Sequence, residues 1–360
     1  MRNSMDPNTS PSSSGLRAIP FKRLVLFTIL FILLSSAGVY VIYAQFAERS
    51  FSFDWRLVSF PFLLWVLLLL IVYYVADGLR LHFTLRALGH RMSRGKVFRL
   101  VFINIFFSNV TPMATGGGFA QIWYMQRQGI PLGTATAATT IRTLLAVVFI
   151  FVATPLFLLS LESLENSAIS GQIAAYLAVF ITLYLGFFAI LLLRTRWLLP
   201  PLTLIINALH RVNLINTDRQ MHWRFKSKRE MLRFAHSFAA YRKGAPGDVL
   251  LSVIFTVVFL LSLFSFPALL MQALGYDVSY LNVVGLLVIT TFIMYFSPTP
   301  GASGIAEGVF GHFFSGVLSG NHLVLVTVAW RLLTIYLGML IGVFVTQAEL
   351  MRTRSMHGRA

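Results

Sequence analysis

The sequence predicts an all-α polytopic membrane protein with about six full spans and two re-entrant hairpins, arranged as an inverted-topology repeat. Of its 360 residues, 57% are hydrophobic and only 11% are charged. The mean hydropathy of +0.77 is far above that of a soluble domain of this length. Two of the apolar segments are interrupted by prolines and glycines, and the two interruptions match each other in sequence. These three observations together indicate a transporter-like membrane fold.

The second interruption is the more pronounced, because residues 278–306 carry no charge and yet contain Pro298, Pro300, Gly301 and Gly304. Proline removes a backbone donor, and a broken backbone is tolerated at membrane depth only where it is buried in protein or lines a cavity. An upstream segment repeats the pattern 188 positions earlier (300 − 112 = 188): Thr111, Pro112, Ala114, Thr115 and Gly116 match Thr299, Pro300, Ala302, Ser303 and Gly304.

The first part of the chain predicts a tail and two spans. Residues 1–20 are rich in Ser, Pro and Asn and are expected to form a disordered tail. Residues 24–44 are uncharged and long enough for a first span, and a second span is expected at about 58–77. The loop between these spans has balanced charge, whereas Arg and Lys dominate the segment 80–99. The positive-inside rule therefore places the second loop in the cytoplasm.

Residues 100–126 predict the first hairpin, which enters from the cytoplasm, because the apolar arms on either side of Pro112 are too short to span alone. Spans at about 132–160 and 173–193 are expected to follow. The segment 194–247 is the most basic in the chain and is predicted to be a cytoplasmic connector on the anionic membrane surface.

The second half repeats this order with the opposite orientation. A span at 249–275, an external turn at 276–278, a second hairpin within 280–318 and a last span at about 322–347 bring the C-terminal tail 351–360 to the cytoplasm. A single transmembrane domain is thus expected over 21–350. Within it, repeat 1 covers about 58–160, and repeat 2 covers about 248–347. Loop charge predicts a multi-pass protein of the cytoplasmic (inner) membrane with both termini on the cytoplasmic side.

Arg142 and Arg331 each stand alone about ten residues into a long apolar span. An arginine near the bilayer centre costs at least ~2.5–3.5 kcal/mol unless it faces a partner or water. The simplest interpretation is that each arginine anchors its helix to hairpin carbonyls. We favour a shared site for one anionic headgroup, because guanidinium groups bind phosphate bidentately and keep their charge.

Glu307 is the one carboxylate within the second hairpin, and Phe119 stands at the corresponding place in the first. It can pair with an arginine, contact a cationic headgroup or carry a coupling proton. The remaining predicted substrate-binding residues are small or neutral and belong to the two interruptions: Gly116, Gly117, Gly118, Gln121, Thr299, Pro300, Gly301, Ser303 and Gly304. The glycines either present backbone N–H groups to an anion or only allow close helix packing. Asp77 is interpreted as an interfacial residue at the end of the second span.

The motifs TPxxTGG at Thr111–Gly117 followed by Gln121, and PTPGxxGxxE at Pro298–Glu307, resemble those of the lysylphosphatidylglycerol synthase/flippase transmembrane family. Arg331 fits the resemblance, which covers about residues 20–350. It implies a role in translocating or handling charged lipids. Many members carry a Glu shortly after the first glycine pair, where this chain has Phe119. We expect no aminoacyl-transferase domain, and therefore no synthesis of aminoacylated lipid by this chain.

The leading functional prediction is therefore a flippase for an anionic or charged-headgroup phospholipid or a polyprenyl-phosphate-linked intermediate, and not an enzyme. The alternative is a membrane glycosyltransferase or lipid-modifying enzyme of envelope glycolipid assembly. The chain lacks the Asp-x-Asp pattern typical of many such enzymes. No metal or cofactor is expected. The net charge of +17 lies mainly in loops and predicts contact with anionic lipid, not with nucleic acid. The absence of cysteine excludes disulfides.

Overall fold

The computed structural model describes residues 52–160 and 217–357 continuously, together with isolated residues between 29 and 44 and between 179 and 207. Helix is the regular structure in these ranges, and no strand occurs in them, which confirms the all-α membrane fold. Four helical segments of the described chain are long and apolar enough to cross a membrane: Phe60–Ala87, Leu132–Leu158, Pro246–Ala273 and Gly320–Met351. The spans expected at 24–44 and 173–193 lie outside the continuously described residues.

The two halves of the chain have the same order of helices. The first half consists of α2 (Phe60–Ala87), α3 (Arg94–Val110), the 3-10 turn η2 (Pro112–Ala114), α4 (Thr115–Arg127) and α5 (Leu132–Ser160). The second consists of α10 (Pro246–Ala273), α11 (Tyr280–Met294), the 3-10 turn η4 (Pro300–Ala302), α12 (Ile305–Phe314), and α13 (Gly320–Arg331), which continues through the π-helical turn η5 (Leu332–Tyr336) into α14 (Leu337–His357). Corresponding helices start 186 to 190 positions apart, at 60 and 246, 94 and 280, 115 and 305, and 132 and 320.

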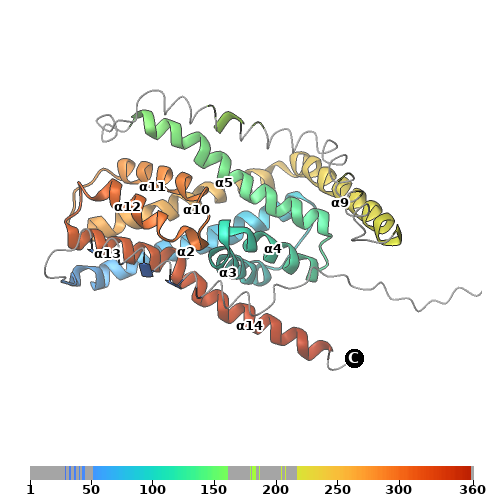
Figure 1. Cartoon of the computed structure of the whole chain (residues 1–360), viewed down its shortest axis with the longest axis horizontal. Helices are drawn as coiled ribbons and strands as arrows, with labels where there is room; N and C mark the ends of the chain where they lie inside the picture. Colours follow the sequence, from blue (N-terminus) through green and yellow to red (C-terminus); the bar gives the residue numbers. More distant parts are fainter. Residues whose placement is uncertain are drawn as a thin grey trace, which may run out of the picture.

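The two hairpins enter the bundle from opposite ends. An ion pair of 3.2 Å between Arg86 and Asp248 joins the end of α2 to the start of α10 and marks what we call the Arg86 end. The hairpin α3–α4 starts and finishes at this end, whereas the hairpin α11–α12 starts and finishes at the other, as Figure 1 shows. The tips η2 and η4 contact each other between the two ends. This arrangement is the inverted-topology repeat that the sequence predicts.

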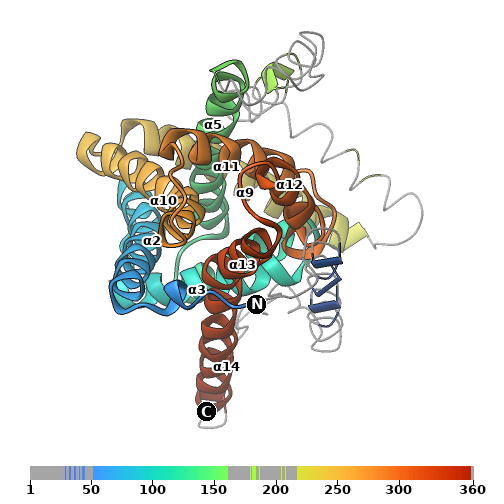
Figure 2. The same ribbon diagram turned by 90° about the vertical axis from the view of Figure 1, so that its left-hand side faces the viewer.

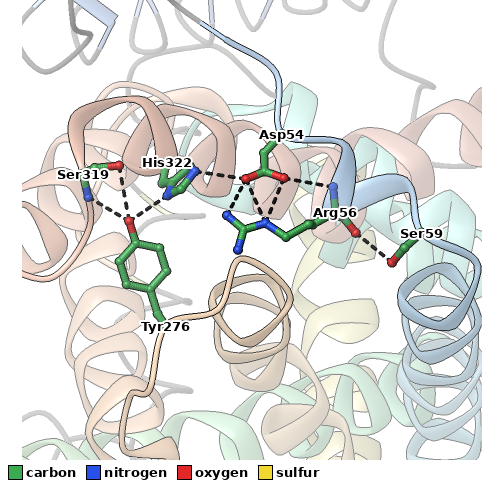
Figure 3. Close-up of polar contacts among 6 residues, drawn as sticks. All are labelled: Asp54, Arg56, Ser59, Tyr276, Ser319 and His322. Atoms are coloured by element: carbon green, nitrogen blue, oxygen red, sulfur yellow. Dashed lines mark hydrogen bonds and ion pairs between the residues drawn. The ribbon is translucent and has the colours of Figure 1, made fainter.

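A polar network ties the helices together at the opposite end, which we call the Asp54 end (Figure 3). Asp54 accepts hydrogen bonds from the backbone and side chain of Arg56 in the 3-10 turn η1 (Trp55–Val58). His322 Nε2, at the start of α13, lies 3.3 Å from Asp54 Oδ2. His322 Nδ1 is 2.7 Å from the hydroxyl of Tyr276, which also accepts from Ser319 N at 3.1 Å. The network thus links the segments that precede α2, α11 and α13.

Close packing joins α14 to the first hairpin. A Cβ added at Gly342 would lie 2.4 Å from the carbonyl oxygen of Phe102 in α3, so glycine allows the two helices to approach there. Beyond this contact α14 projects from the bundle, which Figure 2 shows most clearly. A further helix, α9 (Thr217–Lys243), packs mainly against α5 at the Arg86 end.

The second span is longer than predicted. The sequence placed its end at about residue 77, where the first charged side chain occurs, but α2 continues to Ala87. Asp77 and Arg80 are both inside the bundle, at 2% and 7% exposure. The prediction was wrong because a charge ends a span only when it is unpaired, and these two side chains form an ion pair.

Candidate functional site

The two hairpin tips share two consecutive residues with left-handed backbone. Met113 and Ala114 in the first tip have φ of 53°, and the corresponding Gly301 and Ala302 have φ of 58° and 53°. Left-handed backbone costs roughly 1–2 kcal/mol for a residue other than glycine, and it persists only where its surroundings enforce it. The predicted echo therefore extends from residue identity to an unusual local geometry.

Arg331 lies against the second tip with its side chain fully buried. Its Nε is 2.7 Å from Glu307 Oε1, and both side chains have 0% exposure. Its Nη2 donates to the carbonyl oxygen of Gly301 at 2.9 Å and lies 3.3 Å from Ser303 Oγ. The guanidinium group therefore holds a broken segment of backbone and a carboxylate at the same time.

The carboxylate in turn caps the helix that follows the tip. Gly304 N donates to Glu307 Oε2 at 2.6 Å, and Gly304 has a φ of 85°. Thr299 Oγ1 donates to the carbonyl oxygen of Ser303 at 2.9 Å, while Pro300 is buried at the start of η4. The structure thus brings together the residues that the sequence singled out in the second hairpin.

Two nitrogens of this arginine, Nε and Nη1, make no hydrogen bond to the described residues. Arg331 Nη1 is buried and lacks a partner among the described residues. The Nε contact to Glu307 is an ion pair by distance, although its N–H direction does not meet hydrogen-bond geometry. A buried charged donor without an acceptor is unfavourable by about 1–3 kcal/mol or more, so an added acceptor here would be stabilising. The π-helical turn η5 follows Arg331 directly, and such turns are frequent at functional sites.

A second buried cluster lies between α2 and α5. Asp77 Oδ1 accepts from Arg80 Nε at 2.6 Å and from Arg142 Nη2 at 2.5 Å. The guanidinium carbon of Arg80 lies 3.8 Å from the ring centroid of Phe259 on α10. Arg142 is 4% exposed, and its Nε lacks a hydrogen-bond partner among the described residues. One carboxylate thus serves two guanidinium groups, which gives the cluster a formal excess of positive charge.

The two buried clusters change three interpretations drawn from the sequence. Asp77 is not an interfacial residue, because it is buried and bound to Arg142. Arg80 was assigned to a loop and missed, although its i,i+3 spacing from Asp77 was a usable signal. The sequence interpretation gave Arg142 and Arg331 one shared anionic partner. In the structure each arginine pairs with its own carboxylate, Arg142 with Asp77 and Arg331 with Glu307.

Two glycines of the first hairpin, Gly116 and Gly117, have no space for a side chain. Gly116 N donates to Thr111 Oγ1 at 2.7 Å. A Cβ added at Gly117 would lie 1.8 Å from Ser108 Oγ on α3. Gly118 has more space, because the nearest atom to its added Cβ is a methyl carbon of Thr139 at 3.9 Å.

Gln121 is the polar side chain that the sequence placed beside these glycines, and it is 4% exposed. Its Nε2 donates to Asn104 Oδ1 at 2.6 Å, which joins α4 to α3. Its Oε1 is buried without a hydrogen-bond partner in the part of the chain that the structure describes. The side chain therefore retains one acceptor inside the first hairpin.

Comparison with known proteins agrees with these motifs. The family model described as the lysylphosphatidylglycerol synthase TM region matches residues 24–342. A UPF0104 membrane protein of Archaeoglobus fulgidus is 23% identical over 330 residues, which cover 89% of this chain and 97% of that relative. The family model extends over the two hairpins and both helices that carry the buried arginines.

Proposed function

We propose that this chain, which belongs to the lysylphosphatidylglycerol synthase transmembrane family, translocates a lipid with an anionic or charged headgroup across the cytoplasmic membrane. Phospholipids and polyprenyl-phosphate-linked intermediates have suitable headgroups. Membership of the family indicates a function related to membrane lipids. One observation carries the proposal. The tips of two hairpins that enter from opposite ends contact each other inside the bundle, and the same bundle contains two buried arginine–carboxylate clusters.

The charges of the clusters favour an anionic headgroup. Arg331 and Glu307 compensate each other, whereas Arg80 and Arg142 share the single carboxylate of Asp77. A phosphate group would supply the missing negative charge and accept several N–H groups at once. Arginine suits this task because it stays charged and its donors match phosphate oxygens in pairs.

In this scheme the carboxylates are the counter-ions of the buried arginines while no headgroup is bound. Removing one partner from a buried ion pair costs about 3–5 kcal/mol, so a guanidinium group inside the bundle needs a counter-ion before the headgroup binds. A headgroup phosphate that replaces Glu307 at Arg331 would keep the arginine compensated throughout the exchange. Release of the headgroup would restore the original pair.

Two structural elements suit a change of access. The left-handed tips η2 and η4 contact each other, and a separation of the tips would open a route between the two ends of the bundle. The π-helical turn η5 directly follows Arg331, and turns of this kind often mark functional sites. Repeats of opposite orientation that move against each other are the usual basis of alternating access.

The orientation in the membrane follows from charge. Exposed basic side chains gather at the Arg86 end, after α2 and at the start of α3, so we assign this end to the cytoplasm. Single cysteines can be placed at Lys96 and Asp277, which are exposed at opposite ends of this cysteine-free chain. A membrane-impermeant maleimide applied to intact cells should label the cysteine at 277 and spare the cysteine at 96. Labelling of position 96 alone would reverse the orientation.

Translocation is tested with purified protein in liposomes that contain a fluorescent phosphatidylglycerol, a polyprenyl-phosphate analogue or a phosphatidylcholine. Dithionite quenches only the label in the outer leaflet, so translocation appears as extra quenching. The proposal predicts faster exchange of an anionic lipid than in protein-free liposomes and little effect on phosphatidylcholine. Equal rates with and without protein for every anionic lipid, together with glycosyl transfer to a lipid acceptor, would favour the enzyme alternative.

A further inference from the structure

A cleft between α5 and α9 lies at the Arg86 end and has a volume of about 360 Å³. Its lining combines two arginines, a histidine and two hydroxyl groups with a leucine and a proline: Arg229, Arg233, His236, Thr134, Ser237, Leu232 and Pro131. We propose that this cleft binds the phosphate of an anionic lipid headgroup in the membrane leaflet at that end. It has no residue in common with the buried clusters, so it is separate from the proposed translocation site.

The position of α9 is fixed by its inner face. Phe234 and Ser237 are buried at 8% and 6% exposure, and Phe238 packs on the core formed by α2 to α5. The hydroxyl of Tyr241 lies 2.6 Å from Ser252 Oγ on α10. These contacts hold α9 against the bundle at the Arg86 end and leave the opposite face of the helix exposed.

The cations of the cleft follow one another along α9. Arg229, Arg233 and His236 are four and then three positions apart, so they lie on one side of the helix, and all three are exposed. Ser237 Oγ donates to Thr134 Oγ1 at 3.3 Å in the wall that α9 shares with α5. Two guanidinium forks above a hydroxyl-bearing wall are well suited to the oxygens of a phosphate group.

The exposed apolar residues indicate that the phosphate belongs to a lipid. Met221, Phe225 and Leu232 are 57%, 69% and 46% exposed. Their helical positions place them on the same outward side as the arginines. The sequence of α9 contains eight Lys and Arg residues against two Asp and Glu residues. A helix whose exposed side mixes bulky apolar groups with cations lies in the interface of an anionic leaflet.

The binding is measured with the full-length protein in non-ionic detergent, by fluorescence anisotropy of a labelled dihexanoyl phosphatidylglycerol. We expect saturable binding that unlabelled phosphatidylglycerol displaces, whereas dihexanoyl phosphatidylcholine does not. Arg229→Gln/Arg233→Gln should weaken binding about tenfold or more, because both guanidinium contacts to the phosphate are lost. Lys228→Gln/Lys243→Gln removes the same charge from exposed positions of the same helix outside the cleft and should have little effect.

Three results would overturn the proposal. One is parent-like affinity in the Arg229→Gln/Arg233→Gln variant, with the fold verified by its melting temperature. A second is an equal loss in the Lys228→Gln/Lys243→Gln variant, which would mean attraction by net charge and no defined site. The third is displacement by inorganic phosphate as effective as that by phosphatidylglycerol, which would mean that the cleft binds a free anion. Translocation by the arginine variant can be measured separately, since the buried clusters remain intact.

Discussion

Glu307→Gln is the most informative single change in the second hairpin. It removes one negative charge and preserves the shape of the side chain, and the amide oxygen can still accept from Gly304 N. Arg331 then loses its counter-ion at a position of 0% exposure. Breaking a buried pair from one side costs about 3–5 kcal/mol, a large part of the roughly 5–15 kcal/mol that stabilises a typical fold. We therefore expect a clearly lower melting temperature in detergent.

A paired variant separates charge from packing. Replacing both partners, as in Glu307→Gln/Arg331→Met, leaves no uncompensated charge and should destabilise less than Glu307→Gln alone. Glu349→Gln provides a matched control, because Glu349 pairs with Arg99 at 3.0 Å in a partly exposed position, where an ion pair contributes at most about 1 kcal/mol. The experiment compares thermal unfolding of the four proteins at pH 7. An unchanged melting temperature for Glu307→Gln would refute the view that this carboxylate compensates Arg331.

Two further predictions concern packing and pH. Gly342→Ala should lower the melting temperature by an amount equivalent to about 1–3 kcal/mol, because the new methyl group meets the backbone of Phe102. Gly308→Ala is the control, because its methyl group enters open space and should not lower the melting temperature. Equal melting temperatures of the two variants would argue against close packing of α14 on α3. At the Asp54 end, hydrogen bonds from Arg56 hold the pKa of Asp54 well below its ordinary value. The stability from this carboxylate is therefore fully present above its unfolded pKa of about 3.9 and is lost as the pH falls through the lower folded value. Asp54→Asn should thus melt below the parent at pH 7 and approach it in acid, and a gap that widens in acid would contradict this assignment.

Sequence reasoning was most successful where backbone chemistry limits the choices. Proline and glycine in an uncharged segment allow few structures at membrane depth, so both hairpins were predictable. Their opposite orientation was predictable from the charge of the loops. The left-handed pair at Met113 and Ala114 was not, because neither residue type favours that backbone. The tertiary contacts of the tips, and not local preference, set that conformation.

The partners of the arginines were harder to predict. The pair of Arg331 with Glu307 was one of several alternatives, and only the fold selects it. The role of Asp77 was missed because the chain separates it from Arg142 by 65 positions, and one sequence does not show which helices pack together. A charged residue near the end of an apolar segment is therefore assigned to the membrane–water interface unless its buried ion-pair partner is known.

The central claim is that the buried arginines handle an anionic headgroup, and translocation rates in liposomes test it most directly. Arg142→Gln and Arg331→Gln are compared with the parent and with Arg99→Gln, which removes a partly exposed arginine of α3. Rates are expressed per folded protein. Loss of a charged contact to phosphate should weaken headgroup binding roughly ten- to a hundredfold, so both buried variants should translocate anionic lipid far more slowly than Arg99→Gln. Parent-like rates for both Arg142→Gln and Arg331→Gln with every anionic lipid would contradict the account and leave the arginines as structural anchors.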